Sequence, residues 1–143
     1  MQVQSYLFFY GRCEEALAFY EAKLGAEVLF KLRNNEAPDA NAVQGEYGDK
    51  ILHTSFRIGD TVVMASDGHP EQQAASYSGF SLSLALDDPA EAKARFDALA
   101  EGGQIRLEWQ PTFFSEGFGM LTDKFGIPWM IMAAKRTDEG GAA

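Results

Sequence analysis

The chain has 143 residues, with 12 basic and 21 acidic side chains and a formal net charge of −9. This length suits one domain that buries about two-thirds of its unfolded surface. An acidic chain without a Lys/Arg cluster repels nucleic-acid phosphates and anionic membranes, so we expect neither as a partner. The single cysteine, Cys13, cannot form an internal disulfide, and no apolar run of signal-peptide or membrane-span length precedes it, so we expect a cytoplasmic protein.

The first half of the chain predicts a strand, a helix and three further strands. Glu14 and Glu15 open the helix, where its dipole favours acidic residues, and Gly25 ends it. A polar, proline-containing loop at 33–50 and a Gly59-Asp60 turn separate the later strands. The predicted strands are 3–9, 27–32, 51–58 and 61–66, and the apolar helix positions are Cys13, Ala16, Leu17, Tyr20 and Leu24.

The second half predicts the same order of elements. Asp88 is placed to cap a helix, Pro89 occupies its first position, and Gly102-Gly103 follows it. In the first strand, Ser81 and Ser83 alternate with leucines that can face the helix. The predicted strands are 79–86, 104–110, 117–122 and 128–133.

The order β-α-β-β-β therefore occurs twice and predicts an α+β fold built from a duplicated module. We expect one domain over residues 1–136, with module 1 at 2–67, a linker at 68–78 and module 2 at 79–136. Residues 137–143 are polar and contain glycine, which predicts a disordered tail. A duplicated module places a ligand site in the cleft between its halves.

Several motifs carry a resemblance to a known family. They are Phe19-Tyr20 before Leu24-Gly25, Met64-Ala65-Ser66-Asp67, Tyr77-Ser78-Gly79-Phe80, Trp109-Gln110 with Thr112-Phe113, and the run from Gly117 to Met130, which includes Asp123-Lys124-Phe125-Gly126. With these motifs, residues 2–136 resemble the vicinal oxygen chelate superfamily of glyoxalases, bleomycin resistance proteins and dioxygenases, and within it the PhnB-like branch. The resemblance implies two modules that curl into a half-barrel cup with the helices outside, and a homodimer.

In the metal-using enzymes of that superfamily, four His and Glu side chains bind one divalent ion. The resemblance places these positions at Ser5, Met64, Ser81 and Met130. Hydroxyls and thioethers are poor ligands for such ions, which prefer imidazole and carboxylate. The residues one position away on either side include no carboxylate or imidazole. We therefore expect no metal and no cofactor, and we argue against glyoxalase-type isomerisation and ring-cleaving dioxygenation.

His53 is the best candidate for a catalytic residue. Strand alternation places it with Ser55 and Arg57 on a polar face that can look into the cup. Imidazole suits proton transfer or anion binding, although a lone histidine is more often a hydrogen-bonded structural residue.

Trp109 and Gln110 are candidates for a pocket wall and a polar contact, with core packing as the alternative for the tryptophan. Met64 and Met130 are candidates for a soft cup floor, with simple filling of the core as the alternative. Cys13 lies on the buried stripe of its helix beside two glutamates, which disfavours a reactive thiolate.

The sequence thus predicts a homodimeric, PhnB-like protein that holds a small hydrophobic or mixed organic ligand without a metal. Whether it catalyses a reaction stays open. One alternative is a metal-dependent lyase, isomerase or oxygenase that recruits a divalent ion through non-standard ligands such as His53. A second alternative is a resistance protein that sequesters a drug or other xenobiotic stoichiometrically. The expected ligand-binding residues are Ser5, His53, Met64, Ser81, Trp109, Gln110 and Met130.

Overall fold

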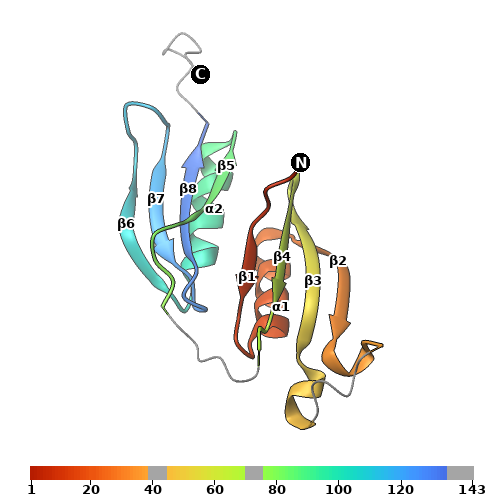
Figure 1. Cartoon of the computed structure of the whole chain (residues 1–143). Helices are drawn as coiled ribbons and strands as arrows, with labels where there is room; N and C mark the ends of the chain where they lie inside the picture. The colour runs from red at the N-terminus through yellow and green to blue at the C-terminus, as the bar shows by residue number, and fades with distance from the viewer. Residues whose placement is uncertain (39–44, 70–75, 135–143) are drawn as a thin grey trace. The chain divides into compact units, whose positions relative to one another are not determined.

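A computed structural model describes residues 1–38, 45–69 and 76–134 (Figure 1). The chain divides into two compact units, Met1–Ala75 and Ser76–Ala143. Each unit has the order strand, helix and three strands, so the predicted α+β fold with a duplicated β-α-β-β-β module is confirmed. The predicted disordered tail, 137–143, and residues 70–75 of the predicted linker lie outside the described residues.

The N-terminal unit is a four-stranded mixed sheet with one helix. The sheet order is β1-β4-β3-β2, in which β1 runs parallel to β4 and the other neighbours are antiparallel. In the segment predicted as a plain loop at 33–50, the described residues on either side of 39–44 include two short 3-10 helices. The elements are β1 (Tyr6–Phe8), α1 (Cys13–Leu24), β2 (Glu27–Arg33), η1 (Asn34–Glu36), η3 (Gly45–Asp49), β3 (Ile51–Ile58) and β4 (Thr61–Ser66).

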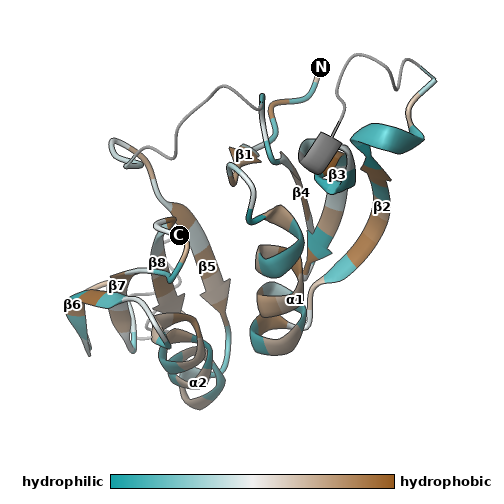
Figure 2. Ribbon diagram, turned by 90° about the horizontal axis from the view of Figure 1, so that it is seen from below, coloured by the Kyte–Doolittle hydropathy of each residue, from teal (hydrophilic) through white to brown (hydrophobic). Residues whose placement is uncertain are grey.

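Helix α1 supplies the core of this unit. Figure 2 shows hydrophilic and hydrophobic residues on both α1 and α2, as expected for helices with one buried face. Leu17 and Tyr20 of α1 are buried, and the Tyr20 ring stacks on Phe56 of β3 with 6.0 Å between centroids. Val63 and Ala65 of β4 are buried as well, while Met64 between them is half-buried. Because side chains alternate along a strand, α1 covers one face of the sheet and the other face carries a separate set of residues.

A buried aspartate ties β4 to the beginning of α1. Arg12, at the N-cap position, makes no side-chain capping bond. Instead Oδ1 of Asp67 accepts hydrogen bonds from the backbone N–H groups of Gly11 (2.8 Å) and Cys13 (2.7 Å). Its Oδ2 accepts from the N–H of Ile51 at 2.7 Å. The carboxylate therefore satisfies the Cys13 N–H in the first turn of the helix, where the helix dipole favours negative charge, and it also holds the backbone of Gly11 and Ile51.

The C-terminal unit repeats the arrangement with the sheet order β5-β8-β7-β6. As predicted, the Asp88 side chain caps the helix by accepting from the Ala90 N–H at 3.1 Å. The Phe96 ring packs over Gly119, where an added Cβ would lie 2.5 Å from the ring. The elements are β5 (Leu82–Leu86), α2 (Pro89–Ala100), β6 (Gln104–Gln110), β7 (Phe118–Thr122) and β8 (Pro128–Ala133).

Within the described part of the chain, both α-helices have 12 residues, and neither is long and apolar enough to cross a membrane.

Candidate functional site

The open face of the N-terminal sheet is the face that α1 does not cover. On β3, Thr54 and Phe56 are buried towards the helix, while His53 and Ser55 between them are half-buried. Ser55 pairs with Met64 in the sheet. Since paired residues share a face, His53 and Met64 lie on the same open face, as the alternation of their strands predicts.

The rings of Tyr6, Phe8 and Phe30 lie near His53 on this face, and we call these four residues the His53 cluster. The Tyr6 hydroxyl and His53 Nδ1 are hydrogen-bonded at 2.9 Å, and the two rings stack with 5.5 Å between centroids. The Phe30 ring lies 6.1 Å from the imidazole, and the Phe8 ring lies 5.1 Å from that of Tyr6. Tyr6, Phe8 and Phe30 remain 37%, 41% and 49% exposed. Aromatic surface is therefore presented to solvent around a single imidazole.

Ser5 lies beside this cluster rather than within it. Tyr6, not Ser5, pairs with Met64, and Ser5 precedes the strand with its carbonyl accepting the Met64 N–H at 3.1 Å. Tyr6, Phe8 and Phe30 are thus the residues of the cluster that the sequence analysis missed. Both faces of the strand that holds Tyr6 and Phe8 are rich in apolar residues, so the pattern left the phase of this strand undetermined.

The open face of the C-terminal sheet is rich in methionine. Met130 pairs with Ser83 on one side and with Met120 on the other, and Met132 occupies the next row of the same face. Met130 thus lies on an open face, and Ser81 precedes β5 by one residue. Thioether side chains give this face a soft surface that can adapt to irregular shapes.

Trp109 faces the other way, towards α2. Its ring packs on Phe96 with 5.4 Å between centroids, and an added Cβ at Gly117 would lie 2.3 Å from it. The adjacent Gln110 pairs with Phe118 across the sheet. Residues next to each other in a strand point to opposite faces, so the sheet does not bring Trp109 and Gln110 together.

The predicted site residues are divided between the two units. Ser5, His53 and Met64 belong to the N-terminal unit, and the other four belong to the C-terminal unit. A single site lined by both sets stays a prediction. The His53 cluster lies entirely in the first unit.

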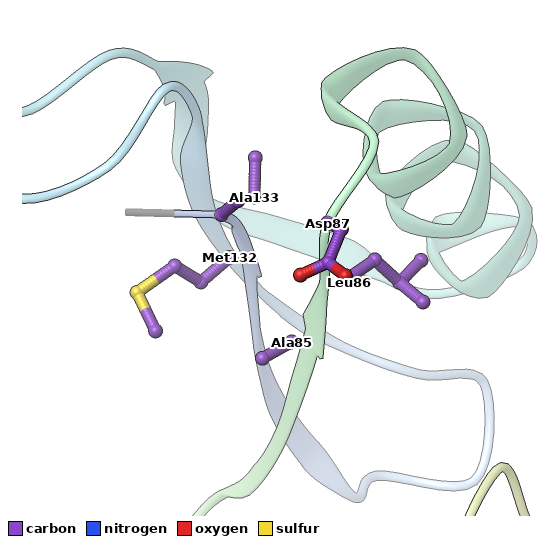
Figure 3. A pocket seen from close by; sticks show the side chains of 6 residues that line it. Ala85, Leu86, Asp87, Met132 and Ala133 are labelled. Atoms are coloured by element: carbon purple, nitrogen blue, oxygen red, sulfur yellow. The ribbon is translucent and has the colours of Figure 1, made fainter. Parts of the chain in front are cut away.

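A pocket of about 350 Å³ lies in the C-terminal unit where β5 and β8 end (Figure 3). Its lining is mainly apolar, and Asp87 contributes the one carboxylate shown there. It contains none of the predicted site residues. The lining residues are Ala85, Leu86, Asp87, Met132, Ala133 and Ala134.

Two ionisable groups at the beginning of α1 have shifted pKa values. Hydrogen bonds from Arg33 (2.5 Å) and Lys31 (3.1 Å) lower the pKa of Glu14 to about 2. Burial, together with the nearby charges of Asp67 and Glu14, raises the pKa of the Cys13 thiol well above its usual range. Cys13 is therefore a protonated core residue at neutral pH, which agrees with its predicted lack of reactivity.

The sequence profile of the glyoxalase/bleomycin resistance protein/dioxygenase superfamily matches residues 2–131, and the chain belongs to this superfamily. Protein YjdN from Escherichia coli (strain K12) is 42% identical over 144 residues, which cover 95% of this chain and 97% of that protein. The crystal structure of protein PA1353 from Pseudomonas aeruginosa is 38% identical, with a TM-score of 0.84 over 95% of this chain and 99% of that one. A PhnB protein from Bacillus cereus, described as a putative 3-demethylubiquinone-9 3-methyltransferase, shares the fold, with 24% identity and a TM-score of 0.77 over 94% of this chain and 100% of that one.

The residues on the two open faces do not fit the divalent ion of the superfamily's metal-using enzymes. Met64 pairs with Tyr6, and Met130 pairs with Ser83, so these rows offer thioether, phenol and hydroxyl groups. The one imidazole, His53, already uses Nδ1 for its hydrogen bond to Tyr6. Across the described residues no group of three or more His, Cys, Asp or Glu side chains is arranged to hold a metal ion. Thioether, phenol and hydroxyl groups are poor ligands for the hard or borderline divalent cations that such enzymes use.

Proposed function

We propose that this protein binds a small, partly aromatic or hydrophobic organic ligand on the open face of its N-terminal sheet, without a metal or other cofactor. The observation that carries the proposal is the His53 cluster. Ligand sites combine apolar and aromatic walls with a few polar groups that fix orientation, and the cluster has this composition.

The exposure of the three rings supports a binding role. The unit already has a buried core on the α1 side, formed by residues such as Leu17, Tyr20 and Phe56. Tyr6, Phe8 and Phe30 add nothing to that core, yet they lie on one face within ring-contact distance of each other or of His53. A contiguous exposed apolar patch of this kind is typical of an interaction site, whereas scattered single residues are not.

We also propose that the protein is a cytoplasmic homodimer, as the family resemblance implies. The edge strand β2 also carries Leu29, which is 44% exposed and lies outside the His53 cluster, and this supports an apolar contact with a second chain. A buried, lone thiol at Cys13 is compatible with a reducing compartment. Light scattering after size exclusion would give twice the chain mass of 15.7 kDa for a dimer.

The binding proposal is tested with the fluorescent probe 1-anilinonaphthalene-8-sulfonate on full-length, untagged, chelator-treated protein. We expect saturable binding with a fixed stoichiometry. Phe30→Ala should weaken it about fivefold or more, because an aromatic contact is lost. Phe113→Ala is the matched control, since Phe113 is an exposed phenylalanine of the other unit, and it should leave the affinity unchanged.

Two results would overturn the proposal. One is binding of the probe that never saturates or that Phe30→Ala leaves intact. The other is binding that requires added Zn²⁺, Ni²⁺ or Mn²⁺, which would favour the metal-dependent alternative. With a natural ligand in hand, turnover would separate an enzyme from a sequestering protein.

A further inference from the structure

We propose that Tyr6 and His53 act as one hydrogen-bonding unit that binds an acceptor oxygen on a planar aromatic ligand. The ligand class is therefore an aromatic carboxylate or phenolate. This inference rests on the proposed function and adds to it the chemical class of the ligand and the roles of two residues.

The Tyr6 hydroxyl and His53 Nδ1 share one proton in their hydrogen bond. The Tyr6 hydroxyl oxygen lies 2.9 Å from His53 Nδ1, and the tautomer of the imidazole decides which atom donates. When the hydroxyl donates to Nδ1, the imidazole carries its proton on Nε2. When Nδ1–H donates to the hydroxyl oxygen, the phenol O–H is free to point elsewhere. In both tautomers the pair keeps one N–H or O–H group with which it can donate to a ligand.

Aromatic rings form the surface next to that donor. The imidazole stacks on Tyr6 at an interplanar angle of 30°, and the Phe30 ring lies on its β2 side. The ring of Phe8 extends the aromatic surface beyond Tyr6, at 5.1 Å between centroids. Aromatic groups pair favourably in offset-stacked or edge-to-face geometry at 4.5–7 Å, so a flat aromatic ligand matches this surface better than a saturated one.

The polar groups on this face favour one kind of ligand charge over another. Aromatic rings by themselves also suit organic cations. On this face, however, the alternation that exposes His53 and Ser55 continues to Arg57, which forms an ion pair with Glu27 on the adjacent strand. The guanidinium and the carboxylate of this ion pair balance each other, so this face carries no net charge beside His53 that would attract a cation. The proton that the Tyr6–His53 pair offers therefore decides the preference, and it favours an oxyanion or another acceptor oxygen over a cation.

The experiment titrates the full-length, metal-free protein with naphthalene-2-carboxylate and follows the amide shifts of ¹⁵N-labelled protein. Two comparison probes isolate the two parts of the inference. Decahydronaphthalene-2-carboxylate keeps the carboxylate but lacks aromaticity, and 2-naphthylmethylammonium keeps the rings but carries a cation. We expect the aromatic carboxylate to bind at least about tenfold more tightly than either, with shifts on β1, β3 and β4.

Variants test the two residues directly. Tyr6→Phe and His53→Phe keep a ring at each position and remove the polar atoms, and each should raise the Kd of the aromatic carboxylate about five- to tenfold. Neither should change its Kd for the ammonium probe by more than about twofold. His69→Ala changes the other histidine, which lies exposed outside the sheet, and should have no effect. An unchanged circular dichroism spectrum and melting midpoint would show that the variants are folded.

The inference is wrong if either comparison probe binds as tightly as the aromatic carboxylate, or if both variants bind it normally. If the aromatic carboxylate fails while the anilinonaphthalene probe still binds at Phe30, the ligand class is refuted and the proposed function stands. If both probes fail and Phe30→Ala converts a dimer into monomers, the face is an interface between two chains, and both proposals are wrong.

Discussion

Replacing Asp67 by asparagine is predicted to destabilise the N-terminal unit strongly. The side chain is 1% exposed, and its two oxygens accept three backbone hydrogen bonds at 2.7–2.8 Å. An asparagine of the same shape can still accept from Gly11 and Cys13 through its single oxygen. Its NH₂ group then faces the N–H of Ile51, so that two donors meet.

The expected magnitude follows from these contacts. A buried N–H left without an acceptor costs about 1–3 kcal/mol. Loss of the charge from the two remaining bonds costs about 0.5–1 kcal/mol each, since charge-assisted bonds are roughly twice as strong as neutral ones. The sum is about 3 kcal/mol, a large part of a typical domain stability of about 5–15 kcal/mol. With a urea dependence of about 1.5 kcal/mol per M, the midpoint falls by about 2 M.

The assay is urea unfolding followed by far-ultraviolet circular dichroism, with tryptophan fluorescence recorded in parallel. Both tryptophans, Trp109 and Trp129, belong to the C-terminal unit, so fluorescence reports on that unit alone. Asp60→Asn is the matched control, because Asp60 is an exposed turn residue whose change should cost less than about 0.5 kcal/mol. A dichroism midpoint that Asp67→Asn leaves unchanged would refute the role assigned to this carboxylate.

Three further predictions concern Glu14, Cys13 and Gly119. The folded-state pKa of Glu14, about 2, is below its ordinary value of 4.5, so its contribution is present above pH 4.5 and is lost as the pH falls towards 2. Glu14→Gln should remove that part of the acid sensitivity, no more than about 1 kcal/mol for a half-exposed side chain, and equal acid unfolding curves would contradict this. The Cys13 thiol should react with Ellman's reagent only after urea unfolding, whereas rapid labelling of the native protein would show that it is accessible. Gly119→Ala places a Cβ 2.5 Å from the Phe96 ring and should lower the free energy of unfolding by about 1–3 kcal/mol. The fluorescence transition should then occur at a lower urea concentration. An unchanged transition would mean that the Phe96 ring can move aside without loss of stability.

The fold was largely predictable because local signals and the global topology agree. The Asp88-Pro89 start of α2 and the Gly59-Asp60 turn are local features of the sequence. Helix α2 begins at Pro89, and β4 begins directly after the turn at Thr61, as the sequence predicts. The start of α1 was recognised without its capping group. Asp67 reaches it from 54 residues away along the chain, and sequence patterns cannot show such a contact.

The site was less predictable because it depends on strand phase. His53 and Met64 lie on the face away from α1, as the alternation of buried and open positions along their strands predicts, and their role in a ligand site stays a prediction. Tyr6 was missed because β1 is apolar on both faces. The pairing of β6 with β7 is irregular between Leu107 and Gln110. Such an irregularity turns the residues that follow it to the opposite face of the sheet, and Trp109 therefore faces α2.

The measurement that tests the metal-free site most directly is elemental analysis of untagged protein purified without chelators. It gives the moles of Ni, Zn, Fe, Mn and Cu per chain. We predict values near zero that persist after incubation with each ion and desalting, as expected from the thioether, phenol and hydroxyl groups beside Met64 and Met130. A value near one mole of any of these metals per chain would contradict the claim, make His53 the first ligand to replace, and restore the metal-dependent enzyme as the leading function.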